Sequence, residues 1–156
     1  MAEIDRTITS LRIVTSAIVI SLLAFAGVAA AFRDAIAGPA AGLLVDWLPG
    51  VVALTALAAA AGYTALRRQA RAELQRRATE IRASADPLAA VLGPYQRLVI
   101  VRSALIEAPA LLALVGYLAG GSGTALGVAA AAVLLLVASL PSRAGLQRFA
   151  DDALQL

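Results

Sequence analysis

The sequence predicts an all-α fold: an integral membrane antiparallel four-helix bundle with a cytoplasmic helical extension of the second span. Three observations predict it, namely an excess of apolar residues, long uncharged segments and an uneven distribution of arginine. Of the 156 residues, 61% are apolar, and the mean hydropathy is +0.85, whereas soluble domains are about 45–50% apolar. A soluble fold of this size would expose much of that surface to water, and a bilayer removes the difficulty.

Four apolar segments are long enough to be candidate spans of a single transmembrane domain, 1–156. A helix needs about 20 apolar residues to cross a hydrocarbon core ~30 Å thick. Residues 13–32 and 47–66 carry no charge, and from Ser103 to Ser142 only Glu107 does, in a run that glycines near 120–123 divide. With their flanks, the spans are expected at about 9–32, 44–66, 97–119 and 123–141.

Arginine positions predict the orientation of these spans. All 13 basic residues are arginines, and on this arrangement only Arg33 lies on the side opposite to the other twelve. Loops on the cytoplasmic side of a membrane carry an excess of basic residues. We therefore expect a multi-pass protein of the bacterial inner (cytoplasmic) membrane with both termini in the cytoplasm.

The cytoplasmic loop 67–96 is expected to be helical and to continue the second span to about residue 85. Oppositely charged residues lie four apart, Glu73 with Arg77 and Arg76 with Glu80, which stabilises a helix. An apolar stripe at steps of four and three predicts one packing face on it. The stripe consists of Leu66, Ala70, Leu74, Ala78 and Ile81.

Two signals predict where the next helices begin. Asp86 is placed to cap a short helix that starts at Pro87, because aspartate favours the N-cap position and proline the first helical position. Gly93-Pro94 is expected to end that short helix and to begin the third span.

The tail, residues 142–156, is expected to form an amphipathic helix. Ser142 is placed to cap it, and Pro141 to end the fourth span. We expect the tail to lie along the inner membrane surface or to dock on the 67–85 helix. Its apolar face consists of Leu146, Phe149, Ala150 and Ala153.

Glu107 is the one charged residue well inside an expected span. Tyr95 and Tyr117 are 22 residues apart, and at ~1.5 Å per residue this is about the thickness of the hydrocarbon region. If both tyrosines lie at the membrane boundaries, as aromatic residues often do, Glu107 lies at mid-membrane. A carboxylate at that depth should face protein or water, take a partner, or stay protonated.

Two hypotheses follow for Glu107. In the first it holds helices together, by hydrogen bonds to hydroxyls of neighbouring spans or by pairing with an arginine that reaches inward; the candidates are Thr15, Ser16, Ser21, Thr55, Arg12 and Arg102. In the second it is an ion or proton site. Ser103 lies on the same helix face, and Pro109 leaves the Leu105 carbonyl without its helical partner, free to coordinate.

Two resemblances accompany these patterns. Residues 102–118, with Glu107 among them, resemble the carboxylate-bearing helix of rotary ATP synthase c subunits, which implies that Glu107 carries a proton or sodium ion; the match covers about 17 of 156 residues. The whole chain resembles small uncharacterised bacterial four-span membrane proteins through Pro141-Ser142-Arg143 and Leu154-Gln155-Leu156. That second resemblance gives no indication of what the chain does.

The amino-acid composition excludes several kinds of active site. The chain has no cysteine and no histidine, which excludes disulfides, thiol or imidazole catalysis, and the usual ligands of zinc or haem. We expect no enzymatic activity, no cofactor and no metal site. The sequence therefore predicts a non-enzymatic membrane scaffold or accessory subunit, the alternative being an oligomeric proton- or cation-translocating bundle that uses Glu107.

The expected partners are the lipid bilayer and either further copies of the chain or a larger membrane complex. Small residues let membrane helices approach closely, and four glycines offer such points: Gly27, Gly62, Gly116 and Gly127. Arginines that follow the second span are candidate contacts for anionic lipid headgroups, or else only set the topology; they are Arg67, Arg68, Arg71, Arg76 and Arg77. Nucleic acid is not expected, because no aromatic residue is interleaved among these arginines.

Overall fold

The computed structural model describes residues 2–36, 41–84, 86–120 and 123–154, and the all-α prediction is confirmed. Within these residues there are six helices, of which four are long and two are short. They are α1 (Ala2–Ile36), α2 (Ala41–Arg76), α3 (Ala78–Arg82), α4 (Pro87–Gly120), α5 (Gly123–Ala138) and α6 (Arg143–Leu154).

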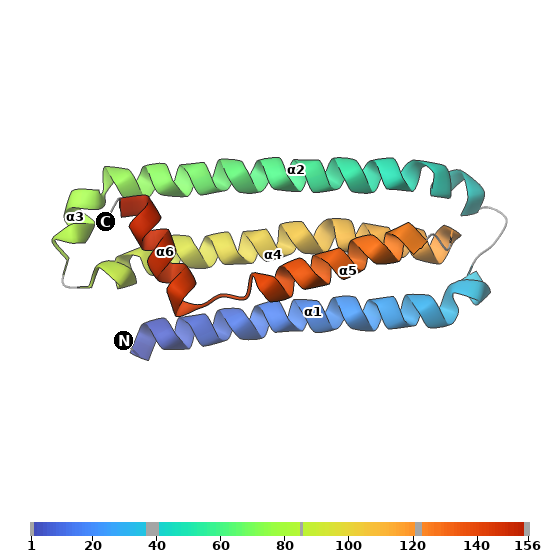
Figure 1. Ribbon diagram of the computed structural model, residues 1–156, viewed down its shortest axis with the longest axis horizontal. Helices are drawn as coiled ribbons and strands as arrows, with labels where there is room; N and C mark the ends of the chain where they lie inside the picture. Colours follow the sequence, from blue (N-terminus) through green and yellow to red (C-terminus); the bar gives the residue numbers. More distant parts are fainter. Residues whose placement is uncertain (1, 37–40, 85, 121–122, 155–156) are drawn as a thin grey trace.

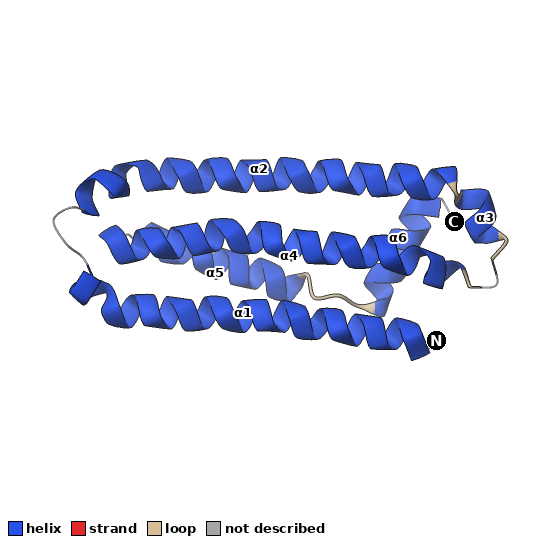
Figure 2. Cartoon of the chain, turned by 180° about the vertical axis from the view of Figure 1, so that it is seen from behind, coloured by secondary structure: helices blue, strands red, loops and turns tan. Residues whose placement is uncertain are grey.

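The long helices are not arranged as a symmetric bundle. In Figure 1, α4 lies between α1 and α2, and α5 lies over α4 and α1; Figure 2 shows the same order from behind, with α4 in front of α5. Among the long helices α2 packs chiefly on α4, while α5 packs on both α4 and α1. The side chains of α2 and α5 therefore leave a groove between these helices, with α4 as its floor.

Three helices are long and apolar enough to cross a membrane, within the part of the chain that the structure describes. They are Glu3–Ala35, Trp47–Arg76 and Pro87–Gly120; a fourth candidate is counted if α5 and α6, which meet at a bend of 82°, form one broken span. Large apolar side chains project outward from them, such as Ile13 (65% exposed) and Leu57 (68%). The chain is thus a candidate multi-pass membrane protein, since these side chains need a non-aqueous surrounding.

The fourth expected span, 123–141, is shorter than predicted. Helix α5 ends at Ala138, and its 16 residues measure about 24 Å at ~1.5 Å each, less than a ~30 Å hydrocarbon core. The helix ends early because Pro141 has no amide hydrogen for the Val137 carbonyl. Four residues, 139–142, then lead to the start of α6 at Arg143.

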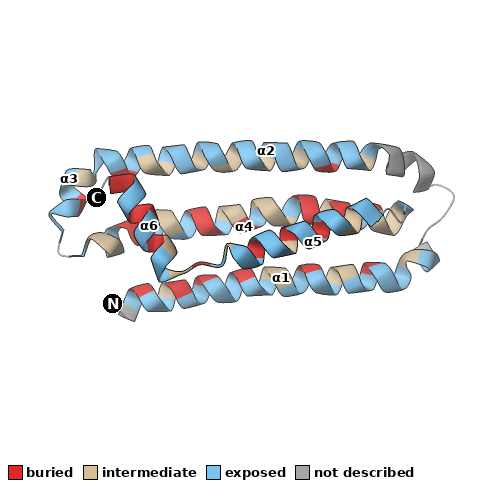
Figure 3. Ribbon diagram, viewed as in Figure 1, coloured by how far each residue is buried: buried red, intermediate tan, exposed pale blue. Residues whose placement is uncertain are grey.

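Buried side chains form two clusters (Figure 3). The first lies at the end of the molecule where Ala2 and Leu154 are found (Figure 1), and it joins α1, α2, α3, α4 and α6. The second lies midway between α1, α4 and α5 and is built around Leu22, Leu114 and Leu136. No described residue of α2 belongs to this second cluster, so α2 is the least embedded of the long helices.

The region between the second and third spans differs from the prediction at two points. Helix α2 ends at Arg76 and not near 85, because Arg77 adopts non-helical angles (φ −100°, ψ 7°) before α3 begins. Helix α4 runs unbroken through Gly93-Pro94. A proline inside a helix removes only one backbone hydrogen bond, here that of the Ala90 carbonyl, and the turns on both sides hold the helix together.

Other local predictions are confirmed. Asp86 caps α4, since its Oδ1 accepts a hydrogen bond from the Ala89 amide at 3.1 Å. Ser142 caps α6 in the same way, through the Gly145 amide at 3.0 Å. The apolar stripe of the 67–85 region and the apolar face of the tail both pack into the first cluster. Of the two places expected for the tail, the structure shows docking on α2, in addition to α4.

Close helix approach occurs at one of the four expected glycines. A Cβ on Gly116 of α4 would collide with the side chain of Leu48 on α2, whereas Gly27, Gly62 and Gly127 have open space where a Cβ would lie. These three therefore do not serve contacts within the chain, and only Gly116 brings two helices together.

Candidate functional site

Glu107 is half-buried on the side of α4 that faces α1. Leu111 and Leu114, one and two turns further along the same side of the helix, pack in the second cluster with Leu22 of α1. Residues spaced by four and seven positions share a helix face. Glu107 thus lies at the edge of the α1–α4 contact and away from the groove between α2 and α5.

The helix contacts expected of Glu107 are not made. Among the described residues, no hydrogen bond or ion pair joins it to another side chain. The Thr15 hydroxyl donates instead to the Leu11 carbonyl (2.9 Å), and the Thr55 hydroxyl to the Val51 carbonyl (2.7 Å). Both threonines thus satisfy their hydroxyls within their own helices, as is common for this residue.

The two arginines expected near Glu107 are held elsewhere. Arg12 of α1 donates to the Pro141 carbonyl at 2.8 Å, and Arg102 of α4 donates to the Ser139 carbonyl. These carbonyls follow the last turn of α5, where the chain has left the helix and lacks backbone partners. Two arginines from two helices therefore bind the α5–α6 connection.

Ser103, another residue of the expected ion site, lies one helical turn before Glu107 on the same side of α4. Ser103 is 1% exposed, and its hydroxyl has no hydrogen-bond partner within the described residues. The Leu105 side chain lines the opposite side of α4, in the groove between α2 and α5. The structure thus places one hydroxyl without a partner among the described residues a turn from the carboxylate.

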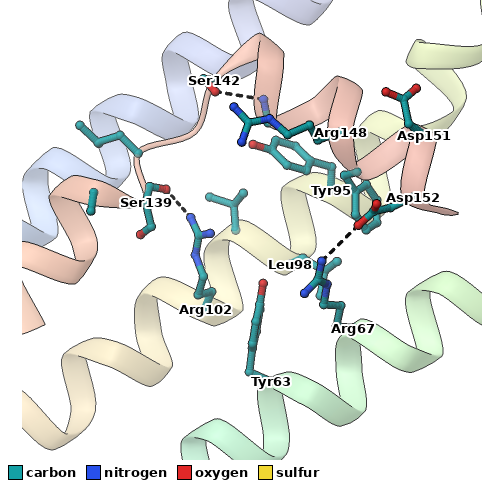
Figure 4. A pocket seen from close by; sticks show the side chains of 15 residues that line it. Tyr63, Arg67, Tyr95, Leu98, Arg102, Ser139, Ser142, Arg148, Asp151 and Asp152 are labelled. Atoms are coloured by element: carbon teal, nitrogen blue, oxygen red, sulfur yellow. Dashed lines mark hydrogen bonds and ion pairs between the residues drawn. The ribbon is translucent and has the colours of Figure 1, made fainter.

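A larger polar site lies at the end of the molecule where α6 crosses. A cavity of about 680 Å³ opens between α2, α4 and the α5–α6 connection (Figure 4). Tyr63 rises into it from α2, and its hydroxyl points toward the space between Arg102 and Arg67 (Figure 4). Its charged lining residues are Arg67, Arg102, Arg148, Asp151 and Asp152.

Helix α6 forms one wall of this cavity because small and aromatic residues fit together. Gly145 lies where a Cβ would come within 2.9 Å of the Tyr95 hydroxyl, so only glycine lets α6 approach α4 so closely. The rings of Tyr95 and Phe149 are in contact, with centroids 5.8 Å apart. Tyr95 therefore packs against α6, whereas the sequence predicts it only as a residue at the membrane boundary.

Electrostatics in the cavity favour an anion. Asp152 is bound on one side by Arg71 (2.7 Å) and Arg67 (3.3 Å), both from α2. Arg102 binds only a neutral carbonyl, and its Nε is buried without a partner; Arg148 forms no ion pair within the described residues. Two guanidinium charges thus remain without a carboxylate partner, on walls contributed by α4 and α6.

The five arginines expected to touch lipid headgroups have different surroundings. Arg67 and Arg71 hold the tail through Asp152, and Arg77 lies 3.7 Å from Glu80, three residues on. Arg68 and Arg76 are exposed. The expected pairs Glu73–Arg77 and Arg76–Glu80 are not formed, since Arg77 pairs with Glu80 instead.

Sequence reasoning missed this cavity. The sequence suggests Arg102 only as a partner of Glu107, and no pattern links it to Tyr63 or Arg148. One signal was available: a proline three residues after the end of an apolar helix predicts a non-helical turn, and the exposed carbonyls of such a turn need donors. Nothing in the sequence says that Arg12 and Arg102 would supply them.

Comparison with protein-family models, with curated proteins and with solved structures finds no match for this chain. The function is therefore argued below from the geometry of the chain itself.

Proposed function

We propose that this chain is a non-enzymatic integral membrane protein that serves as a scaffold or accessory subunit. It lies in the bacterial inner membrane as four crossings with both termini in the cytoplasm, and α5 together with the α5–α6 connection makes the fourth crossing. The observation that supports the proposal is the set of contacts that the charged residues make. They bind helix ends together at one end of the molecule, while the flanks of the long helices expose apolar side chains.

Arginine distribution supports the orientation. The N-terminus, the C-terminus and all of α3 and α6 lie at one end of the molecule (Figure 1), and twelve of the 13 arginines belong to segments at or near this end. Arg33 lies near the other end, 5.7 Å from the ring centroid of Tyr117. Because positive residues are retained on the cytoplasmic side, the end closed by α6 faces the cytoplasm.

The polar contacts at this end support a structural role. Arg12, Arg102 and Arg82 each donate to a backbone carbonyl of the α5–α6 region, the last to Leu154. Arg143 of α6 lies 4.0 Å from Asp5 of α1. These contacts tie α1, α3 and α4 to the α5–α6 connection and the tail, and they fix the relative positions of the helices, as a scaffold requires.

The apolar flanks are the surfaces through which such a scaffold would bind its partners. Leu54 and Leu57 of α2 are each 68% exposed, and Leu134 of α5 is 69% exposed. Membrane helices associate by close packing of such flanks rather than by a hydrophobic drive. The partner is either further copies of this chain or another subunit of a membrane complex.

The test is the mass of the particle extracted from its native membrane in a mild nonionic detergent. A scaffold or accessory subunit gives a particle whose protein mass is a multiple of the 15.8 kDa chain or contains a second protein in fixed stoichiometry. A particle with one copy of the chain and no other protein, at every detergent concentration tried, contradicts the proposal.

The second candidate is an oligomeric proton- or cation-translocating bundle that uses Glu107. It is favoured by one observation: the carboxylate lacks a partner within the described residues and lies a turn from the unpartnered hydroxyl of Ser103. In reconstituted vesicles, such a bundle gives a proton or cation flux that Glu107→Gln abolishes and Glu107→Asp weakens. Equal flux from wild type and Glu107→Gln, at matched protein content, eliminates this candidate.

A further inference from the structure

We propose that the groove between α2 and α5, together with the polar cavity at its inner end, binds one anionic phospholipid. The phosphate of the headgroup lies in the cavity with Arg102 and Arg148, and one acyl chain lies in the groove on α4. This inference rests on the membrane placement proposed above.

The groove is apolar and continuous with the cavity. A space of about 470 Å³ is lined by small residues of α2 and α5, among them Ala56, Ala59 and Ala131, over Leu105 and Pro109 of α4. Alanine side chains leave room that larger residues would fill, and α2 and α5 do not close over it.

The groove has sufficient length for an acyl chain. A second space of about 320 Å³ follows toward the other end of α2, and it shares Ala56 and Val128 with the first. The two spaces extend along α2 from Pro49 to Tyr63, about 21 Å at ~1.5 Å per residue, against the ~15 Å that one leaflet contributes to the hydrocarbon core. An acyl chain of the cytoplasmic leaflet therefore fits along this path.

The polar end of the groove provides the recognition of charge. Tyr63 and Arg102 line both the apolar space and the polar cavity, so they mark the junction between them. At this junction the Nε of Arg102 is buried without a hydrogen-bond partner, and Arg148 lines the same polar cavity from α6, without an ion pair within the described residues. Guanidinium groups bind phosphate oxygens through charge-assisted hydrogen bonds.

A zwitterionic lipid fits this arrangement less well. The cavity lining carries three arginines against two aspartates, and Asp152 is already bound by Arg67 and Arg71. The remaining positive charge favours a headgroup with a net negative charge over one whose ammonium group cancels its phosphate. The occupant is thus an anionic phospholipid rather than any lipid of the bilayer.

The experiment is native mass spectrometry of the purified, delipidated chain in nonionic detergent. Phosphatidylglycerol and phosphatidylcholine with identical acyl chains are titrated separately. We expect one tightly bound phosphatidylglycerol and an affinity for phosphatidylcholine at least about five-fold lower, the equivalent of the ~1 kcal/mol that one basic residue contributes near an anionic lipid surface. Equal binding of the two lipids overturns the proposal.

Matched variants locate the site. Arg148→Gln should weaken phosphatidylglycerol binding about five-fold, whereas Arg68→Gln, an exposed arginine outside the cavity, should leave it unchanged. Ala131→Phe should block the groove, and Ala130→Phe, an exposed neighbour on α5 that does not line it, should not. Equal effects within either pair overturn the proposal. Arg148 is exposed and Ala131 faces the groove, so neither change removes a buried contact of the fold.

Inorganic phosphate distinguishes a headgroup pocket from a lipid site. Millimolar phosphate should not displace the bound phosphatidylglycerol, because the acyl chain contributes to its binding; complete displacement contradicts the role of the groove. Fractionation with the membrane is measured on the cells from which each preparation is purified. If the chain fractionates with the membrane but binds no phosphatidylglycerol, the lipid site is wrong and the membrane placement stands.

Discussion

The two halves of the molecule are held together by different interactions. At the end where α6 crosses, α6 covers the first cluster, and arginines from α1, α2 and α4 bind its aspartate or the carbonyls beside it. Along the long helices, leucines such as Leu22 and Leu114 pack with small residues such as Ala110, and at the far end Gly116 packs against Leu48.

The difference reflects the two surroundings. On the proposed placement, water surrounds the end where α6 crosses, so burial of Leu146 and Phe149 favours the docking of amphipathic α6 there. In lipid, the helix surface and the surrounding hydrocarbon are both apolar, so no hydrophobic effect drives helices together. Close packing alone then decides which helices touch. Helix α2, with little of its spanning surface buried, shows the consequence: it is attached mainly at its two ends, and a groove remains between them.

The largest expected effect is at the docked tail. Leu146 is fully buried, so Leu146→Ala removes apolar contact and leaves a cavity, at a cost of about 2–5 kcal/mol in the free energy of unfolding. The loss should appear as a lower melting temperature in detergent and as faster tryptic cleavage after Arg143 and Arg148. Gln147→Ala, an exposed change on the same helix, is the control. If both variants are cleaved at the wild-type rate, α6 does not hold this end together.

A smaller effect is expected where α2 meets α4 in the membrane. Gly116→Val places a branched side chain against Leu48, and overpacking of this kind costs about 1–3 kcal/mol in the free energy of unfolding. Gly127→Val on α5 meets open space and is the matched control. Thermal unfolding in detergent should separate the two variants. Equal melting temperatures would show that the α2–α4 contact tolerates the added volume and that small residues do not determine it.

The smallest effect is expected at Asp152. Its ion pairs with Arg67 and Arg71 are half-exposed to solvent (36–50% for the three side chains), and pairs of this kind contribute less than about 1 kcal/mol. Asp152→Asn should therefore lower the melting temperature slightly at low salt and not at all at 1 M salt, where charges are screened. Asp151→Asn is the control. A salt-independent loss would mean that the carboxylate acts through packing.

The sequence predicts most of the helices because their signals are local. Uncharged runs, the Asp86 and Ser142 caps, and the apolar stripe through Leu74 each depend on neighbouring residues and an environment of known polarity. The continuous α4 was mispredicted because Gly93-Pro94 disfavours a helix without forbidding one. The break at Arg77 has no sequence signal that we can identify.

The site was less predictable because it depends on contacts between distant segments. Glu107 stands out as a lone charge, yet the structure gives it neither of its expected arginine partners. The cavity combines Tyr63, Arg102 and Arg148 from three helices, and it exists only because the chain turns by 82° between α5 and α6. No residue pattern along the chain encodes that turn direction.

Labelling of single cysteines tests the placement of the chain most directly, since the natural sequence has none. Glu3→Cys, Gln147→Cys and Gly120→Cys are exposed positions at the two ends of the long helices. With a membrane-impermeant maleimide, positions 3 and 147 should react only in inverted membrane vesicles, and position 120 only in intact spheroplasts. Reaction of positions 3 and 147 from opposite faces of the membrane would contradict the fold, the orientation and the docked tail together.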